Sequence, residues 1–412
     1  MIPPEAAAAI SGLPPGRIAV AVSGGSDSTA LLLLMHAAGR EVAAVTVDHG
    51  LRAGSAAEAA SVARLCAERG LAHATLRWAE PGGAGNLQAR AREARRRLMA
   101  DWARGEGIGD IALGHTLDDQ AETVVLRLAR GSGVDGLAAM AAVVEAEGVR
   151  WHRPLLGVRR AALRDWLAGE GVGWIDDPSN ADPRFDRVRV RTALPALAAL
   201  GLGPERLAAT ARGMARAREA LEQATRALAR GCLTDGGAGD LLLDPAGLTG
   251  APEELRLRLI AGALGWVSGE AYRPRLARLE AALAAIEGAR VGHGLTLHGC
   301  VLRARAGRIA IRREPARVAA AVTLAVGRWD GRWELVGEAP SGAGLTIGAL
   351  GAGGLARLGG HPAGLAREAL ATTPAIWRAG ELVAAPIVRP EADFGFRRIA
   401  ASGSPLPDTI PR

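Results

Sequence analysis

The alternation of short apolar runs with helical patterns over residues 17–130 constrains the fold of this chain more than any other feature. Each of four apolar runs has the length of a buried strand and is followed by a segment of helical periodicity. Such alternation predicts right-handed βαβ units, and therefore an α/β fold with a doubly wound parallel sheet. The predicted strands are Ile18–Val22, Val42–Val47, Ala72–Trp78 and Ile108–Leu113, and the predicted helices cover about 26–38, 56–69, 86–104 and 117–130.

The remaining chain predicts smaller, mostly helical and α+β domains behind this N-terminal α/β domain, which we place at 1–203. A chain of 412 residues has room for two or three domains. We expect a bridging amphipathic helix over 204–234, a basic α+β domain over 235–318, and a small β-rich domain with a mobile tail over 319–412. The basic domain should end in a strand pair, Leu295–Arg305 and Arg308–Arg313.

Basic residues are unusual in kind and in position. The chain contains no lysine, so all 50 basic residues are arginines. A protein Schiff base and the lysine of a phosphate-binding P-loop are thereby excluded. The first 200 residues are neutral overall, and the whole net charge of +7 lies in residues 201–412. This distribution indicates a polyanionic partner such as nucleic acid, although a solvated arginine surface is the simpler explanation.

Cysteine usage and hydropathy place the chain in the cytoplasm without a membrane association. Cys66, Cys232 and Cys300 lie far apart, so they predict neither a disulfide framework nor a zinc or iron–sulfur site. No secretory signal is visible at the start, and no uncharged apolar run reaches the length of a membrane span.

A glycine- and serine-rich turn directly after the first predicted strand is the strongest local signal. Two glycines let the backbone approach a ligand closely, and free amides at a helix start point towards an anion. The sequence is neither G-x-x-x-x-G-K-[ST] nor G-x-G-x-x-G. An ordinary helix cap needs one such residue rather than six. We therefore predict a phosphate site formed by Ser23, Gly24, Gly25, Ser26, Asp27 and Ser28.

Two further groups follow the second and fourth strands. Val47 and Asp48 end the second strand, where an adenine or ribose would be held, whereas His49 beside them is better explained by a structural role. His115, Asp118 and Asp119 open a helix after the fourth strand. Acids there also suit the positive end of a helix dipole. Two acids and a histidine in one turn could instead bind a metal, hold a cationic substrate or deprotonate an amine.

These motifs resemble known families. The turn Ser23–Ser28 is similar to the pyrophosphate loop of N-type ATP pyrophosphatases, which cleave ATP between the α and β phosphates. Residues 113–140, LGHTLDDQAETVVLRLARGSGVDGLAAM, resemble the signature of the tRNA(Ile)-lysidine synthetases. The likeness extends to the segments 48–52, 91–95, 153–156 and 174–180 and to the arginines that follow. Arg96 stands where that family more often has an aromatic residue.

The resemblance implies a ligase that uses ATP and Mg²⁺. Such enzymes adenylate the wobble cytidine of an isoleucine tRNA with a CAU anticodon, and free lysine then displaces AMP to give lysidine. The resemblance implies a catalytic domain over 1–203, catalytic roles for Asp27, His115, Asp118 and Asp119, and a Mg²⁺ contact at Asp27. The resemblance leaves open which acid binds the metal and which binds lysine. It also leaves open whether the protein forms a homodimer.

The arginine clusters have a role in this interpretation. Arg92 and Arg95 lie on one predicted helix, and Arg187 and Arg191 form a second group. RNA phosphates or ATP phosphates are their natural targets, with solvated helix faces as the alternative. Few aromatic residues are present, so we expect recognition of RNA by shape and backbone. Two other functions stay in view: a tRNA sulfur-transferase with the same adenylating loop, and a non-catalytic ATP- or RNA-binding protein.

Overall fold

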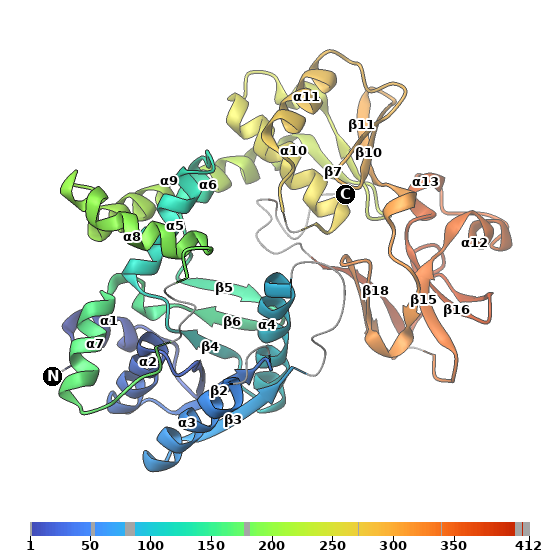
Figure 1. Cartoon of the computed structure of the whole chain (residues 1–412). Coiled ribbons are helices and arrows are strands. Elements are labelled where there is room, and N and C mark those ends of the chain that lie inside the picture. The colour runs from blue at the N-terminus through green and yellow to red at the C-terminus, as the bar shows by residue number, and fades with distance from the viewer. Residues whose placement is uncertain are drawn as a thin grey trace. The chain divides into compact units, whose positions relative to one another are not determined.

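The computed structural model describes residues 2–50, 54–78, 87–176, 182–270, 272–338, 340–399 and 406. The chain divides into two compact units, Met1–Arg218 and Glu219–Arg412, called here the N-terminal and the C-terminal unit. Helix α9 (Pro204–Cys232) contains the boundary between them (Figure 1). The sequence also predicts a glycine-rich loop at Pro81–Gly85. This loop, the segment 177–180 and nearly all of the predicted mobile tail lie outside the described residues.

The N-terminal unit is built on a six-stranded sheet in the order β3-β2-β1-β4-β6-β5. All neighbouring strands are parallel except β5 and β6. The strands are β1 (Ile18–Ala21), β2 (Val42–Asp48), β3 (Ala72–Arg77), β4 (Asp110–Leu113), β5 (Val143–Ala146) and β6 (Val149–His152). The predicted parallel sheet is thus confirmed, and the strand order places the phosphate-loop strand β1 next to β4.

The hairpin of β5 and β6 was not predicted. Its two connecting residues, Glu147 and Gly148, both have positive φ angles, of 53° and 75°. Such a turn matches the twist of a two-residue hairpin. The sequence signal for this hairpin was a pair of strand-like segments on either side of Glu147 and Gly148. It was easy to miss because none of the residues of β5 is buried.

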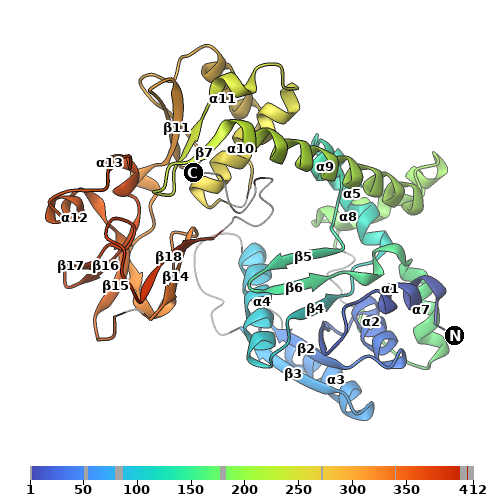
Figure 2. The same cartoon turned by 180° about the vertical axis from the view of Figure 1, so that it is seen from behind.

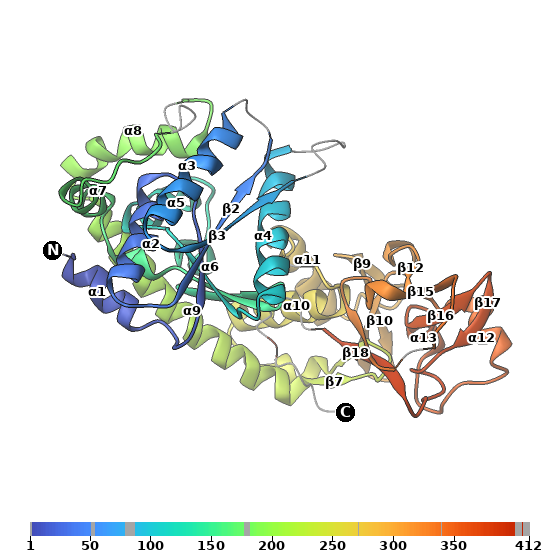
Figure 3. The ribbon, with the colours of Figure 1, turned by 90° about the horizontal axis from the view of Figure 1, so that it is seen from below.

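Helices cover both faces of this sheet. Because side chains alternate along a strand, Ile18 and Val20 face one layer while Ala19 faces the other. Figure 3 shows α2, α3 and α7 on one side of the sheet and α4 on the other. The helices of this unit are α1 (Pro4–Ser11), α2 (Ser26–Ala37), α3 (Ser55–Glu68), α4 (Leu87–Gly105), α5 (Leu117–Leu128), α6 (Val134–Leu137), α7 (Arg160–Gly169) and α8 (Asp186–Ala199).

The C-terminal unit begins with a five-stranded sheet in the order β7-β8-β11-β10-β9, packed against two helices (Figure 1). The strand predicted at Leu295–Arg305 is in fact two strands, because His298 and Gly299 both adopt positive φ and turn the chain back. The elements are β7 (Leu233–Asp235), β8 (Leu241–Leu243), α10 (Glu253–Ser268), α11 (Leu276–Glu287), β9 (Leu295–Leu297), β10 (Cys300–Arg305) and β11 (Arg308–Arg313).

Two smaller antiparallel sheets complete this unit, in the orders β12-β15-β16-β17 and β13-β14-β18 (Figure 2). Their strands are β12 (Val322–Thr323), β13 (Arg328–Trp329), β14 (Trp333–Gly337), β15 (Leu345–Ala349), β16 (Pro374–Arg378), β17 (Glu381–Ala384) and β18 (Phe394–Arg398), with helices α12 (Gly351–Arg357) and α13 (Arg367–Leu370). None of the helices within the described ranges is long and apolar enough to cross a bilayer.

Candidate active site

The turn from β1 into α2 has the geometry of an anion-binding loop. Gly24 adopts a φ of 85°, and Gly25 is the extended N-cap residue of α2. The hydroxyl of Ser28 accepts a hydrogen bond from the Ser23 amide at 3.1 Å and donates to the Gly25 carbonyl at 3.2 Å. These contacts fix the loop, so that the start of α2 faces the space above the strand with its unpaired amides and its positive dipole end.

Two glycines permit close approaches that position this loop. A Cβ atom on Gly24 would lie 2.5 Å from Cδ1 of Ile175, whose amide donates to the Gly24 carbonyl. A Cβ atom on Gly114, after β4, would lie 2.9 Å from the carbonyl group of Asp27. Only glycine therefore allows the turn after β4 to touch the first turn of α2, which brings the two predicted motifs together.

A cavity of about 700 Å³ opens at the carboxyl ends of β1, β2 and β4. It collects most of the residues predicted from the sequence, from five separate segments of the chain. Those that line it are Ser23, Gly25, Ser26, Asp27, Ser28, Val47, Arg95, His115, Asp119, Arg187 and Arg191. The other predicted residues, Gly24, Asp48, Arg92 and Asp118, are not part of its lining as the structure describes it.

Asp119 is held rigidly at the start of α5. Its Oδ2 accepts hydrogen bonds from the amide and the hydroxyl of Thr116, both at 2.8 Å, which completes a capping box. Burial acts to raise the pKa of Asp119, but the charge of Arg160 and the bonds from Thr116 outweigh it, so the pKa lies below its usual value. Asp119 is therefore both the helix cap and an ionised group in the cavity wall.

Arg160, at the first position of α7, joins three carboxylates. Its Nε lies 2.8 Å from Asp27 Oδ2, one Nη lies 3.1 Å from Asp119 Oδ1, and the other lies 3.5 Å from Glu122 Oε1. Burial acts to lower the pKa of Arg160, yet the charges of Asp119 and Asp27 raise it above the ordinary value. A single guanidinium thus links the phosphate loop to the acidic helix.

Glu122 is fully buried on α5. Its Oε1 accepts from Arg191 Nε at 2.9 Å, while its Oε2 finds no hydrogen-bond partner within the described part of the chain. An unpaired buried carboxylate oxygen is costly unless a donor reaches it.

Asp118 points away from the carboxylates that Arg160 joins. It accepts from the Arg160 amide at 2.7 Å and pairs with Arg159 at 3.1 Å. Among the catalytic candidates from the sequence, it therefore holds the start of α7 in place instead of facing the cavity. Asp48 is likewise occupied, since hydrogen bonds from Ser55 and the Gly50 amide lower its pKa.

His115 lies in the cavity wall in its neutral form. Burial lowers its pKa to about 4, and the nearby Asp119 only partly opposes this. Its Nδ1 is buried and has no hydrogen-bond partner among the residues that the structure describes. A neutral imidazole with a free nitrogen is able to accept a proton or a hydrogen bond from a ligand.

The predicted arginine clusters separate into cavity residues and paired residues. Arg95 and Arg187 line the cavity and are exposed within it. Arg95 has a lowered pKa, because the surrounding protein desolvates it and Arg92 repels it, so an anion beside it would be favourable. Arg184 and Arg189 are instead paired with Asp182 and Asp186. Arg96 contacts Glu147 at 2.9 Å and lies over the Trp151 ring.

The oxygen ligands present suit Mg²⁺ only in company with phosphate. No group of three metal-ligating side chains occurs among the residues that the structure describes. Mg²⁺ commonly keeps several waters and takes one or two carboxylates together with substrate phosphates. Asp27, at the start of α2 and in the cavity lining, is placed to be such a carboxylate.

Several cavity residues were missed by the sequence reasoning. Arg160 and Arg164 are one helical turn apart on α7, and Arg164 contacts Ser26 Oγ at 3.2 Å and Asp176 at 3.2 Å. Glu122 was visible in the motif but was explained by the helix dipole. Two arginines with a spacing of four residues, beside the Arg-Pro-Leu-Leu segment at 153–156, were the available signal.

Comparisons with known proteins identify the family of this chain. Residues 5–197 match the PP-loop domain family ATP_bind_3. The chain is 45% identical over 389 residues to the tRNA(Ile)-lysidine synthase of Ruegeria pomeroyi, which covers 92% of this chain and 90% of that protein. It is 42% identical over 388 residues to the tRNA(Ile)-lysidine synthase of Mesorhizobium japonicum, covering 89% and 83%.

Among solved structures, the U34-tRNA thiolase NcsA from Methanococcus maripaludis aligns with 52% of this chain and 79% of its own, at 19% identity and a TM-score of 0.44. A likeness of that size carries no argument about function.

Proposed function

Because this chain belongs to the tRNA(Ile)-lysidine synthase family, we propose that it joins free lysine to the wobble cytidine of an isoleucine tRNA with a CAU anticodon, using ATP. The observation that carries the proposal is one cavity that combines a phosphate loop with ionised carboxylates and a neutral histidine. The location of the protein in the cytoplasm and its oligomeric state stay predictions.

The proposed reaction has two balanced steps. Cytidine O2 attacks the α phosphorus of ATP, and pyrophosphate leaves with the electron pair of the broken P–O bond. The amino group of lysine then attacks C2, and AMP leaves with the former O2. The neutral amine loses one proton to a base in the cavity as the C–N bond forms, and its nitrogen keeps the other hydrogen in the cationic product. Cytidine O2 is a poor leaving group, so adenylation is what makes the displacement feasible.

The phosphate end of the cavity is formed by the start of α2. Backbone amides and the hydroxyls of Ser23, Ser26 and Ser28 offer hydrogen bonds to phosphate oxygens, and the helix dipole favours the negative charge. Asp27, within the phosphate loop, would hold Mg²⁺ against those phosphates. When bound, Mg²⁺ neutralises charge that develops on the leaving pyrophosphate.

The amino-acid end of the cavity is formed by α5. Glu122 lies behind the cavity lining, where it contacts the lining residues Arg160 and Arg191. Its buried carboxylate, with one oxygen unpaired among the described residues, suits the ammonium group of lysine. His115 can accept the amine proton at Nδ1. Its low pKa keeps it unprotonated, and the negative charge of a bound nucleotide would raise that pKa towards the working range.

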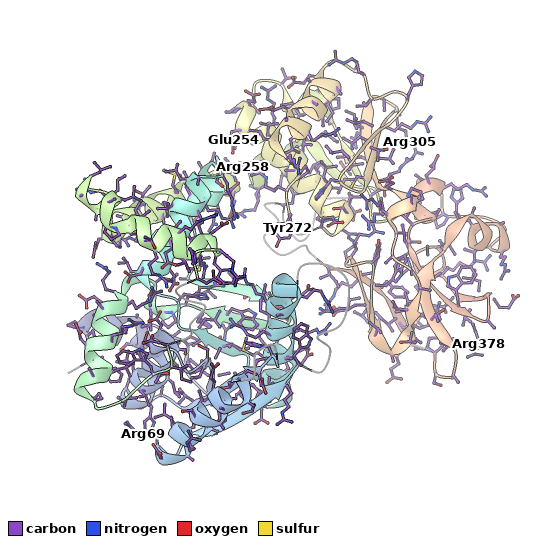
Figure 4. The ribbon with its side chains drawn as sticks, in the orientation of Figure 1. Arg69, Glu254, Arg258, Tyr272, Arg305 and Arg378 are labelled. Atoms are coloured by element: carbon purple, nitrogen blue, oxygen red, sulfur yellow. The ribbon has the colours of Figure 1, made fainter. Side chains whose placement is uncertain are left out.

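Binding of tRNA is assigned to arginines of both units. Arg95 and Arg187 stand in the cavity, where they suit the phosphates beside the target cytidine. In the C-terminal unit, Arg303, Arg305 and Arg308 are exposed along the hairpin of β10 and β11, and Figure 4 labels Arg305 at the end of β10. Contacts of this kind recognise the RNA backbone and not the bases.

The two alternative functions fit the cavity less well. A sulfur-transferase needs a reactive thiolate, but all three cysteines are buried and unpaired. Burial raises the pKa to about 11 for Cys66 and Cys232 and to about 12 for Cys300, so these thiols are unreactive. A non-catalytic binding protein would not need ionised acids and a neutral histidine beside its phosphate loop.

The complete reaction can be tested by the release of AMP, which leaves only when lysine displaces it. Purified protein, ATP and Mg²⁺ are incubated with in vitro transcribed isoleucine tRNA, with and without lysine, and AMP is measured. We expect AMP release that requires tRNA and lysine together. Protein that binds ATP and tRNA but releases no AMP would leave only the binding-protein alternative.

A further inference from the structure

Arg160 occupies the position at which the two cationic ligands of the proposed reaction would bind. Its guanidinium contacts Asp27 on the phosphate side and both Asp119 and Glu122 on the amino-acid side. The side chain is largely buried, at 18% exposure, and its backbone amide is anchored by Asp118. A cation that binds to Asp27, or to Asp119 and Glu122, therefore competes with Arg160 for these carboxylates.

We propose that Arg160 is a positioning residue that couples the two sites, so that lysine binds well only after Mg²⁺ and the nucleotide. This inference rests on the proposed function. In the free protein, Arg160 neutralises the carboxylates and keeps Asp119 and Glu122 closed to an ammonium group. Once Asp27 is engaged with Mg²⁺ and phosphate, Asp27 no longer holds the guanidinium of Arg160.

The released guanidinium has a better partner close by. Arginine binds phosphate oxygens through two parallel hydrogen bonds, and charge-assisted bonds of this kind are about twice as strong as neutral ones. Nucleotide phosphates on the Ser23–Ser28 loop would lie next to Asp27, which Arg160 already contacts. A shift of Arg160 towards those phosphates leaves Asp119 and Glu122 free for the ammonium of lysine.

Arg191 and Arg164 make the arrangement specific to Arg160. Within the described residues, Arg191 is bonded to Glu122 Oε1 at 2.9 Å and contacts neither Asp27 nor Asp119. Arg164, one turn along α7, contacts Ser26 and Asp176 but none of the three carboxylates in the same part of the structure. Arg160 is thus the side chain through which ligand binding on the phosphate side affects ligand binding on the amino-acid side.

The test is a binding cycle on the full-length protein with bound isoleucine tRNA. Lysine is titrated calorimetrically with and without Mg²⁺ and α,β-methylene-ATP, in which the bond cleaved in adenylation is replaced. In the wild type, we expect the nucleotide to tighten lysine binding about tenfold or more, within the usual range of coupling between sites. In Arg160→Gln, lysine should bind more tightly without nucleotide, and the coupling factor should fall to about one.

Three comparisons separate this role from a structural one. Arg160→Lys keeps the positive charge but lacks the planar guanidinium. Without nucleotide, this variant should bind free lysine with an affinity between those of the wild type and Arg160→Gln. Arg164→Gln should weaken the nucleotide but leave the coupling factor unchanged, and Arg212→Gln, an exposed change on α9, should match the wild type. Mg²⁺ alone should raise the Tm of Arg160→Gln more than that of the wild type, which also shows whether the variant is folded.

The outcomes distinguish the two proposals. A folded Arg160→Gln protein with the wild-type coupling factor would overturn the role of Arg160 and leave the proposed function intact. A wild-type protein that binds lysine in neither condition would contradict the proposed function itself.

Discussion

At the scale of single residues, position in the cavity separates side chains that look alike in the sequence. Asp118 and Asp119 are neighbours, yet one holds the start of α7 and the other faces the cavity. Helical geometry explains this, because adjacent residues on a helix point about 100° apart. The sequence predicted that this turn contains the acids, but it could not predict their division, which depends on where Arg159 and Arg160 arrive from α7.

Asp27→Asn should abolish lysine transfer while leaving tRNA affinity unchanged. The substitution removes the charge that Arg160 and the proposed Mg²⁺ contact, and reductions of about 10²–10³-fold or more are typical when such electrostatic groups are removed. Initial rates of labelled lysine incorporation and filter binding of tRNA measure the two effects. A variant with full activity would remove Asp27 from the mechanism.

Asp119→Ala should be inactive and also less stable than Asp27→Asn. It removes the capping box of α5, and losing such a cap costs about 1 kcal/mol. Chemical unfolding of both variants measures the difference. Equal stability in the two proteins would show that the Thr116–Asp119 contacts contribute little.

The low pKa of His115 predicts a pH dependence of stability. Its pKa is about 4 in the folded protein, below the ordinary value of 6.5, so the unfolded chain binds the proton more readily. Stability should therefore fall as pH decreases from about 6.5 to about 4, and be unaffected by this group above that window. His115→Gln should lack this part of the decline in urea unfolding measured from pH 4 to 8. Identical slopes in both proteins would contradict the burial of a neutral His115.

At the scale of elements, most of the N-terminal unit could be predicted, because its strands are buried apolar runs and its helices have clear periodicity. Predicted and observed strands agree at Ile18, Val42 and Ala72. The cavity itself could be predicted only in part. Arg160 and Arg164 come from α7, which follows the fourth strand by more than forty residues, and no local pattern reveals that α7 packs against α2.

Gly114→Ala should disturb both motifs at once. Its Cβ would lie 2.9 Å from the backbone of Asp27, so either the turn after β4 or the first turn of α2 must shift. Overpacking of this kind costs about 1–3 kcal/mol, and ATP affinity should fall with stability. Gly109→Ala, with no atom within 4 Å of the added Cβ, is the matched control. Unaltered ATP affinity in Gly114→Ala would mean that the close approach does not position the loop.

At the scale of the whole molecule, part of the excess positive charge of residues 201–412 lies on exposed arginines of one hairpin. The sequence predicted a basic domain, and the structure exposes Arg303 and Arg305 on the hairpin of β10 and β11. The sequence could not show which arginines are used internally, as Arg332 is, which lies fully buried against Asp330 at 2.6 Å. Net charge therefore overstates the surface that is free to meet RNA.

Replacing Arg303 and Arg305 together by Gln should weaken tRNA binding without affecting ATP affinity. For each arginine–phosphate pair that the substitution removes, the dependence of log Kd on log salt should become flatter by roughly 0.7–0.9. Titrations of labelled tRNA at several salt concentrations give this slope. An unchanged slope would place the RNA footprint of the C-terminal unit elsewhere.

Transfer of radiolabelled lysine to tRNA is the decisive experiment for the proposed function. Protein, ATP and Mg²⁺ are incubated with isoleucine tRNA bearing CAU, with the methionine tRNA of the same anticodon as control. We predict label in the isoleucine tRNA alone, with an equal amount of AMP, and no label with Asp27→Asn. AMP formed without label in the isoleucine tRNA would contradict this function, because the adenylating site would then serve a nucleophile other than lysine.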